Sequence, residues 1–249
     1  MIIGAIIQAR MASTRLPGKV LLPLKGKPML QFQIERLKKS KKLNAIGIAT
    51  STNPENKAII ELANKIGVQA YAGSEEDVLD RYYQAAKQFR FDIIVRITGD
   101  CPLIDPAIVD SVIEKFLADK ADYTNNVDPP TYPDGFDTEV FTFAALEKAW
   151  KEAKAQHHRE HVTAFIRETE GFRKTHLQYP IDLSKLRLTV DNKEDLEVIT
   201  KLVGLLPDGF SLQDVLQALD AHPELTKLNS QFIRDEKYWA QVNAWRNKK

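Results

Sequence analysis

The chain begins with Met1–Gln8 (MIIGAIIQ), an apolar run rich in β-branched residues that is followed at once by a polar loop. The run is too short to span a membrane, and it lacks the basic segment that precedes the apolar core of a signal peptide. Its length and composition instead predict a strand buried on both faces. We therefore expect a soluble, cytoplasmic protein built around this strand.

Strand-like and helix-like segments alternate after this run. Further strands are predicted at about residues 45–50, 68–72 and 92–97. Between the first two of these, Ile59, Leu62, Ala63 and Ile66 recur at the i, i+3, i+4, i+7 spacing of a helix face. Such alternation predicts an α/β fold with right-handed crossovers, a mostly parallel central sheet and helices on both faces. Ligands of such sheets lie at the carboxyl ends of the strands.

The regular alternation of predicted strands and helices ends at about residue 120. Residues 128–135 form a loop rich in Pro and Asp, residues 137–143 alternate like an edge or arm strand, and residues 186–190 read as another strand. Asp105 and Pro106 predict a helix start, and a helix is expected to carry Val162, Phe165 and Ile166. The end of the chain is predicted to be helical. We expect one domain with a small excursion.

The composition is that of an ordinary globular protein. The 249 residues include 35 Lys and Arg against 34 Asp and Glu, which gives a formal net charge of +1, and 43% are hydrophobic. This balance excludes a disordered chain and argues against a nucleic-acid partner. Cys101 is the only cysteine, so neither an intramolecular disulfide nor an all-cysteine zinc site can form. Its expected role is that of a small buried filler.

The loop after the first strand carries three cations, Arg10, Arg15 and Lys19, and no acidic residue occurs before Glu35. Cationic donors beside small residues suit the tight binding of phosphate oxygens. The spacing is not that of a P-loop. The alternative is a solvated basic loop, but the position at a strand's carboxyl end favours phosphate binding.

Two aspartates also follow predicted strands, Asp100 within Thr98–Asp105 and Asp191 after Leu186–Val190. Mg²⁺ is bound by one or two carboxylates together with phosphate oxygens, so the pair could share one such ion. The alternative for Asp100 is a turn residue that bonds its own backbone. Asn192 resembles a helix cap with Asp195 three positions later, so Asp195 is expected to have a structural role.

The segment His157–His161 matches the H-x-x-E-H pattern of inverted zinc peptidases. A third ligand and a metallopeptidase scaffold are not recognisable, so a zinc hydrolase is disfavoured. Arg159, Glu160 and His161 are better explained as lining a polar pocket or capping a helix.

Several motifs together resemble the sugar-activating cytidylyltransferases, which make CMP-activated ketodeoxyoctonate and sialic-type acids. They are similar above all to the spore-coat polysaccharide biosynthesis branch. The resemblance covers about residues 1–205 and rests on segments 6–19, 26–29, 98–102, 134–141, 159–163 and 188–191. It implies a Rossmann-like nucleotide-diphospho-sugar transferase domain over residues 1–205, with residues 206–249 as a helical extension packed on it.

The resemblance further implies CTP as donor, Mg²⁺, and transfer of CMP to a sugar hydroxyl with release of pyrophosphate. The expected acceptor is a sugar acid or a related sugar. Related enzymes are commonly dimers, and residues 137–143 could belong to an exchanging arm.

The matching positions also imply residue roles. The predicted catalytic residues are Arg10, Lys19 and Asp100, and Asp100 and Asp191 are predicted to bind the metal. The nucleotide-binding set is Ala9, Arg10, Ser13, Arg15, Lys19, Arg81 and Gly99. The acceptor-binding set is Asp137, Glu139, Arg159 and His161. Thr98 and Cys101 stand where sugar-acid synthetases often have a carboxamide and an acidic residue.

Two other classes of function remain. A glycosyltransferase on the same fold would also use strand-end carboxylates and a divalent metal, but it would not release pyrophosphate from a nucleoside triphosphate. A non-catalytic nucleotide-binding module would bind CTP without turnover and would not need both aspartates.

Overall fold

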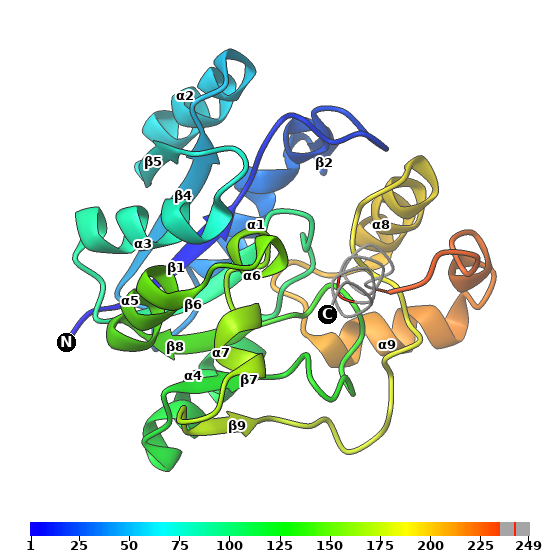
Figure 1. Cartoon of the computed structure of the whole chain (residues 1–249). Helices are drawn as coiled ribbons and strands as arrows, with labels where there is room; N and C mark the ends of the chain where they lie inside the picture. The colour runs from blue at the N-terminus through cyan, green and yellow to red at the C-terminus, as the bar shows by residue number, and fades with distance from the viewer. Residues whose placement is uncertain (235–241, 243–249) are drawn as a thin grey trace.

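The computed structural model describes residues 1–234 and Val242. Within these residues the main sheet has seven strands in the order β5-β4-β1-β6-β8-β7-β9 (Figure 1). All of them run in one direction except β8, which is antiparallel to both of its neighbours. The predicted α/β fold with a mostly parallel sheet is confirmed.

The first half of the sheet contains the four predicted parallel strands, which are β1 (Ile3–Gln8), β4 (Ala45–Ser51), β5 (Gln69–Gly73) and β6 (Ile93–Thr98). The connecting helices are α1 (Met29–Leu37), α2 (Lys57–Lys65, preceded by the 3-10 turn η2, Pro54–Asn56) and α3 (Val78–Phe89). The helix after β6 is α4 (Pro106–Asp119), and Asp105 caps it as predicted by accepting from the Ala107 amide. A short hairpin of β2 (Pro23–Leu24) and β3 (Lys27–Pro28) precedes α1.

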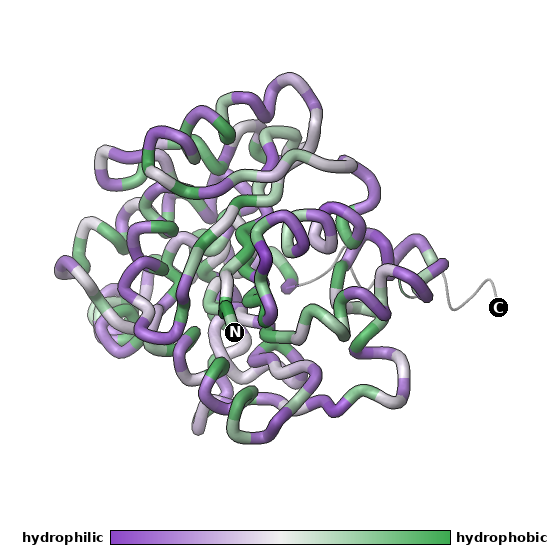
Figure 2. Tube along the Cα trace, turned by 90° about the vertical axis from the view of Figure 1, so that its left-hand side faces the viewer, coloured by the Kyte–Doolittle hydropathy of each residue, from purple (hydrophilic) through white to green (hydrophobic). Residues whose placement is uncertain are grey.

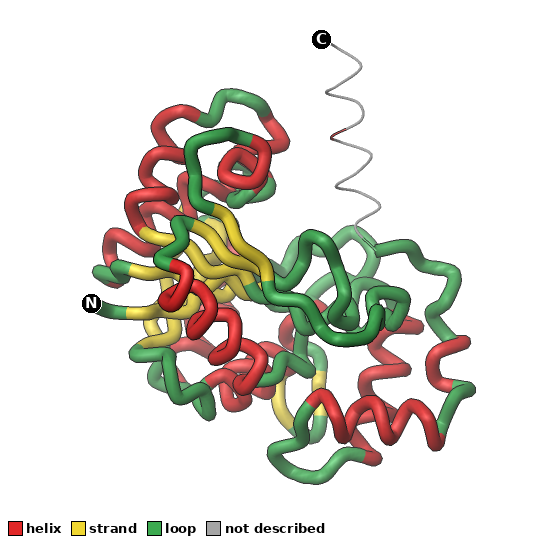
Figure 3. Tube along the Cα trace, turned by 90° about the horizontal axis from the view of Figure 1, so that it is seen from below, coloured by secondary structure: helices red, strands yellow, loops and turns green. Residues whose placement is uncertain are grey.

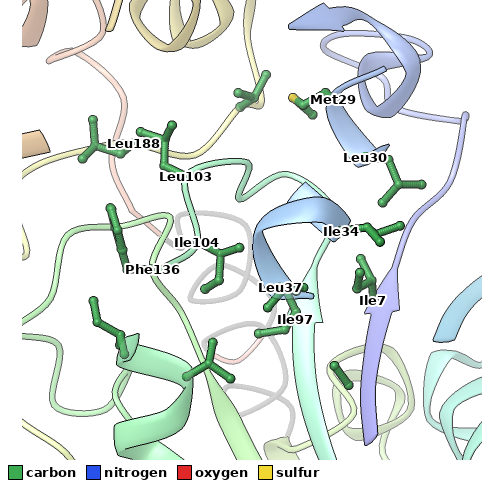
Figure 4. Packing of buried hydrophobic residues seen from close by; sticks show 14 of the residues in the cluster. Ile7, Met29, Leu30, Ile34, Leu37, Ile97, Leu103, Ile104, Phe136 and Leu188 are labelled. Carbon is green, nitrogen blue, oxygen red and sulfur yellow. The ribbon is translucent and has the colours of Figure 1, made fainter. Parts of the chain in front are cut away.

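Helices cover both faces of the sheet (Figure 3). Alternate residues of β1 enter two hydrophobic clusters, because side chains of a strand point to opposite faces. Ala5 and Ile7 pack with α1 and α4, whereas Ile6 packs with α3 and α5 (Phe143–Glu152). Figure 4 shows Ile7 and Ile97 facing Ile34 and Leu37 of α1. Figure 2 shows hydrophobic segments in the interior of the trace and hydrophilic segments on its outer turns.

The strand predicted at residues 137–143 has a different place from the one expected. It forms β8 (Glu139–Thr142), which lies inside the sheet between β6 and β7 (Tyr123–Asn125). Because strands pair with it on both sides, the edge-strand interpretation is wrong, while its exchange between two chains stays a prediction. The sheet then ends at β9 (Lys174–His176).

Two further expectations about local structure are wrong. Residues 186–190 are extended but form no strand, since their amides and carbonyls bond to two loops, at Asp134 and Asp100, rather than to a strand. The helix expected around residues 162–166 is broken into α6 (Gln156–Glu160) and α7 (Ala164–Glu168). Val162 lies between them with φ of 45°, which is incompatible with a continuous helix.

The described C-terminal residues are helical, as predicted, with α8 (Lys193–Leu205), α9 (Leu212–Ala221) and the 3-10 turn η3 (Leu225–Lys227). Residues 235–241 and 243–249 of the predicted extension lie outside the described residues. Phe210, Leu212, Val215 and Leu219 belong to the same hydrophobic cluster as β1. In the described part of the chain no helix is both long and apolar enough to cross a bilayer.

One buried cation joins this C-terminal part to the rest of the fold. Arg36 of α1 is 5% exposed and donates to the carbonyls of Ile104 and Phe210, both at 2.9 Å. Its guanidinium also stacks on the Phe210 ring, 3.5 Å from the centroid. Burial lowers the pKa of Arg36 to about 10, so the group stays charged at neutral pH.

Arg36→Met should therefore destabilise the whole protein. The variant leaves the Ile104 and Phe210 carbonyls without their donor, at a cost of roughly 3 kcal/mol. Urea unfolding should show one transition at a lower midpoint, whereas the exposed Lys41→Met should change the free energy of unfolding by less than about 0.5 kcal/mol. A separate early transition for the C-terminal helices would contradict a single folding unit.

Candidate functional site

The site begins where β1 and β6 end side by side. The Gly99 amide donates to the Gln8 carbonyl at 2.8 Å, which joins the loops that follow the two strands. A Cβ at position 99 would lie 2.8 Å from the Gln8 oxygen and 3.2 Å from the Ala9 Cβ, so this close approach requires glycine. The predicted loops at 9–19 and 99–105 are therefore neighbours.

The basic loop after β1 has a defined shape. The Met11 amide donates to Asn56 Oδ1 at 2.8 Å, and the Met11 carbonyl accepts from the Gly18 amide at 2.9 Å. Gly18 has φ of 69°, a left-handed conformation that favours glycine. The chain then enters the 3-10 turn η1 (Lys19–Leu21) and turns the Lys19 side chain inward, where the residue is 9% exposed.

The Lys19 ammonium joins the two predicted metal-binding aspartates. Lys19 Nζ lies 3.0 Å from Asp100 Oδ2 and 2.8 Å from Asp191 Oδ1, and it also donates to the Val190 carbonyl at 2.7 Å. Arg15 reaches the same Asp191 oxygen at 2.8 Å. The carboxylates of Asp100 and Asp191 therefore converge on one point, as their positions at strand and segment ends suggested.

The charges at this point hold one another ionised. Burial alone would raise the pKa of Asp100, but the Lys19 ammonium and the Thr98 hydroxyl bring it down to about 2. Burial also opposes the charge on Lys19, yet Asp100 and Asp191 outweigh it and raise the pKa of the ammonium. Asp100 and the lysine thus face each other as ions at neutral pH.

Asp191 reaches this point because the segment 186–191 is tied to two loops. The Val190 amide donates to the Asp100 carbonyl at 2.8 Å, and Thr189 Oγ1 donates to the same oxygen at 3.1 Å. Behind it, Arg187 donates to Asp191 Oδ2 and to both oxygens of Asp195, at 2.9–3.0 Å. Asp195 closes the predicted capping box with Asn192.

A cavity of about 300 Å³ opens beside the aspartate pair. It brings together six residues from the predicted nucleotide, metal and acceptor sets, which are Arg15, Asp100, Asp191, Asp137, Glu139 and His161. Its remaining wall comes from Arg96, Thr98, Cys101, Val127, Asp134, Thr163, Arg167, Arg187, Thr189 and Ile233.

The two acidic acceptor candidates differ in their surroundings. Glu139 is 3% exposed, pairs with Arg96 and accepts from Tyr123 Oη at 2.6 Å and Thr163 Oγ1 at 2.7 Å. Burial opposes its charge, but Arg96 keeps the pKa of Glu139 below its usual value. Asp137 is more open and forms an ion pair with Arg234 at 2.7 Å.

Three of the predicted arginines do not line this cavity. Arg10 pairs with Glu75, in the loop before α3. Arg81 is fully buried and donates to the Ser74 carbonyl of the same loop at 2.6 Å. Arg159 binds Asp77 Oδ2 at 2.5 Å and the Trp150 carbonyl at 2.7 Å.

The smaller predicted nucleotide residues lie along the basic loop. Ala9 is buried, and its amide donates to the Ala49 carbonyl of β4. Ser13 Oγ accepts from the Leu16 amide at 3.3 Å and so shapes the turn before Lys19.

Sequence reasoning missed the partly buried arginines of the site, Arg96 and Arg187. Arg96 interrupts the apolar strand β6, and Arg187 interrupts a Leu-Arg-Leu run; each charge at a core position was a signal of a buried ion pair. Cys101 is buried as expected, and its burial, together with the nearby charge of Asp100, raises the pKa of its thiol well above the usual value.

Known proteins resemble the chain over nearly its whole length. A protein of Methanocaldococcus jannaschii of uncharacterised function is 43% identical over 95% of this chain and 97% of its own. The spore coat polysaccharide biosynthesis protein SpsF of Bacillus subtilis is 34% identical over 88% of this chain and 94% of its own.

A solved structure agrees with the fold as well as the sequence. The cytidylyltransferase from Leptospira borgpetersenii serovar Hardjo-bovis superposes with a TM-score of 0.88 and 37% identity, and covers 94% of this chain and 99% of its own. The family model described as cytidylyltransferase matches residues 4–233, which include every residue of the cavity. The chain belongs to the cytidylyltransferase family.

Proposed function

We propose that this protein transfers CMP from CTP to a hydroxyl of a sugar, with release of pyrophosphate, in the synthesis of a cell-surface or spore-coat polysaccharide. Membership of the family and the similarity to SpsF support the reaction class. The observation that carries the proposal is the convergence of Lys19 on Asp100 and Asp191, which places a cation and two carboxylates at the mouth of a polar cavity.

The cationic loop suits the triphosphate. The side chains of Arg15 and Lys19 extend from this loop toward the aspartates. Arg10 lies earlier in the same loop and pairs with Glu75. Their charges would neutralise the leaving pyrophosphate, and the close-packed backbone at Ala9, Ser13 and Gly99 suits a nearby nucleotide. The nucleotide contact of Arg81 stays a prediction, since its side chain supports the loop that carries Glu75.

The aspartate pair fits a divalent metal. Both carboxylates lie within hydrogen-bond distance of one Nζ, and Asp100 is ionised at neutral pH. Mg²⁺ prefers such oxygen ligands, one or two from the protein and the rest from phosphates and water. Asp100 and Asp191 would hold it, and the ion would supply Lewis-acid stabilisation of phosphate charge. Lys19 would exchange a carboxylate for a phosphate oxygen when nucleotide and metal bind.

The cavity beyond the aspartates suits a polyhydroxylated acceptor. Asp137, Glu139 and His161 present polar atoms along its wall, while Arg159 lies outside it and we assign it a structural contact with α3. The acceptor hydroxyl attacks the α-phosphorus in line with the leaving pyrophosphate, so no protein nucleophile is needed. Cys101, with its raised pKa, remains a thiol and takes no part.

The charge distribution also bears on partners and location. A balanced net charge with a local cationic loop suits a small polyanion such as CTP rather than a nucleic acid. A cytoplasmic location and a homodimer, with or without exchange of residues 137–143, stay predictions.

A pyrophosphate-release screen tests the reaction. We expect CTP, among the four nucleoside triphosphates, to release pyrophosphate only when a divalent metal and one acceptor from a panel of sugar acids and amino sugars are present. Release from another triphosphate instead of CTP, or turnover of a nucleotide sugar without pyrophosphate, would contradict the proposal.

Two variants serve as the catalytic controls of that screen. Asp100→Asn and Asp191→Asn should each lower kcat by about 10²–10³, as the loss of one charge-stabilising group does. Both variants should keep the fold intact, with a lower Tm than the wild type because each loses an ion pair with Lys19. Asp208→Asn, an exposed aspartate paired with Lys25, should keep full activity.

Lys19→Met should change how Asp100 titrates. In the wild type the low pKa means that the stabilising contribution of Asp100 is present above about pH 4, the usual value, and is lost as the pH falls toward 2. Without the ammonium, burial dominates and the pKa of Asp100 rises, so the loss begins at higher pH. Carboxyl NMR titration measures this directly.

The exposed Lys25→Met is the matched control for that titration, since it removes a lysine of the same segment that pairs with the distant Asp208. It should leave the pKa of Asp100 unchanged. An Asp100 carboxyl that still titrates near 2 in the Lys19→Met protein would show that Lys19 does not set its charge.

A further inference from the structure

Two imidazoles and one carboxylate meet at the corner between α6 and α7. Nε2 of His157 lies 3.1 Å from Glu168 Oε2, and Nε2 of His158 lies 2.8 Å from the same oxygen. The ligating atoms of the three residues all lie within 4.8 Å of one another. The cluster is separate from the aspartate pair, and no step of the proposed reaction uses it.

The convergence of the two histidines is unusual for neighbours in a helix. Consecutive residues project about 100° apart around a helix axis and do not face the same partner. Here the two ring centroids lie only 4.0 Å apart, and both rings direct Nε2 at one carboxylate oxygen. A simple ion pair on the surface of a helix does not require both imidazoles to face the same carboxylate oxygen.

The backbone at this corner is also held in a costly conformation. Val162, a β-branched residue, has φ of 45°, and the turn places α7 against α6. Left-handed backbone at such a residue persists only where the surrounding contacts fix it. The histidines before the corner and Glu168 after it form a polar contact that spans it.

The donor set has the chemistry of a zinc site. Zn²⁺ takes imidazole nitrogen at about 2.0–2.1 Å and carboxylate oxygen at about 2.0–2.2 Å, so ligands in tetrahedral geometry lie roughly 3.3–3.5 Å apart. The observed 3.1 and 2.8 Å would have to open by about 0.2–0.7 Å to reach this spacing. By contrast, the all-oxygen pair of Asp100 and Asp191 suits the harder Mg²⁺.

The three side chains are buried to different degrees, with His157 the most buried and Glu168 the most exposed. The exposed fractions are 2% for His157, 12% for His158 and 26% for Glu168. The inner histidine is therefore fixed by packing, and the outer carboxylate leaves an entry path and room for water as a further ligand.

We propose that His157, His158 and Glu168 bind one Zn²⁺ ion that clamps α6 to α7. The set differs from the H-x-x-E-H pattern in the sequence, since His158 and a carboxylate from the next helix take the places of Glu160 and His161. His161, Thr163 and Arg167 lie between the ligands in the chain and line the cavity, so the clamp fixes that wall. This consequence for the acceptor rests on the proposed function; zinc binding does not.

The test measures metal content and coordination without CTP. The full chain is stripped with a chelator, loaded with Zn²⁺ and separated from free metal. We expect one zinc per chain in the wild type, a higher Tm than the stripped protein, and loss of both effects in Glu168→Gln and His158→Gln.

The choice of variants separates metal binding from the hydrogen-bonded contact. A glutamine side chain still accepts hydrogen bonds through its amide oxygen, so Glu168→Gln removes the anionic ligand while preserving the contact. His222→Gln is the matched control, because His222 lies 3.3 Å from Glu224 in an exposed pair. It should retain one zinc per chain and the full rise in Tm.

X-ray absorption of the zinc-loaded wild type keeps the test decisive even where a variant fails to fold. Two imidazole nitrogens among the zinc ligands support the site, whereas an all-oxygen shell overturns it. A folded wild type that retains no zinc, or variants that retain it in full, also overturns it, and the cluster is then a hydrogen-bonded contact alone. None of these outcomes bears on pyrophosphate release from CTP.

Discussion

The ion cluster of Lys19, Asp100 and Asp191 is the interaction on which the site depends. The lysine is 81 positions from one aspartate and 172 from the other, so the cluster exists only when β1, β6 and the segment 186–191 are all in place. Breaking a buried pair leaves an uncompensated charge, which is costly. These three charges hold the ends of β1 and β6 and the segment 186–191 together. Binding of a metal and a triphosphate would change the partners of the same three charges, so the stability of the site and its proposed chemistry depend on the same residues.

The charge pattern of the chain has a structural explanation. Each of the five cations in the acid-free opening finds an acidic partner from a later segment. Arg10 pairs with Glu75, Arg15 with Asp191, Lys19 with both aspartates, Lys25 with Asp208 and Lys27 with Glu35. Part of the balance between positive and negative residues therefore consists of ion pairs that join residues 10–27 to later segments. Of these five cations, only Lys19 is buried.

Local patterns predicted the parallel half of the sheet because buried strands such as β1 and amphipathic helices such as α2 carry their periodicity in consecutive residues. The position of Asp100 followed from the rule that strand ends share an edge. Asp191 reaches the same place at the end of an extended segment that forms no strand. Local sequence patterns failed to predict the structure where it depends on which segments pair in space. The sequence of β8 alternates like an edge strand, yet its place beside β6 depends on chain connectivity.

The same limit applies to side chains whose partners are distant in the sequence. Residues 186–190 are extended without a strand partner, and Arg159 looks like a pocket residue but binds Asp77. The pairing of Glu139 with Arg96, and of both histidines with Glu168, required three-dimensional proximity that no spacing encodes.

The most direct test of the central claim is the position of a divalent metal in crystals grown with CTP and Mn²⁺, located by anomalous scattering. We predict a manganese peak coordinated by Asp100 and Asp191, with phosphate oxygens completing its shell and Lys19 moved from the carboxylates to the triphosphate. A metal bound elsewhere, or a triphosphate that lies away from Arg15 and Lys19 while Lys19 still bridges the aspartates, would contradict it.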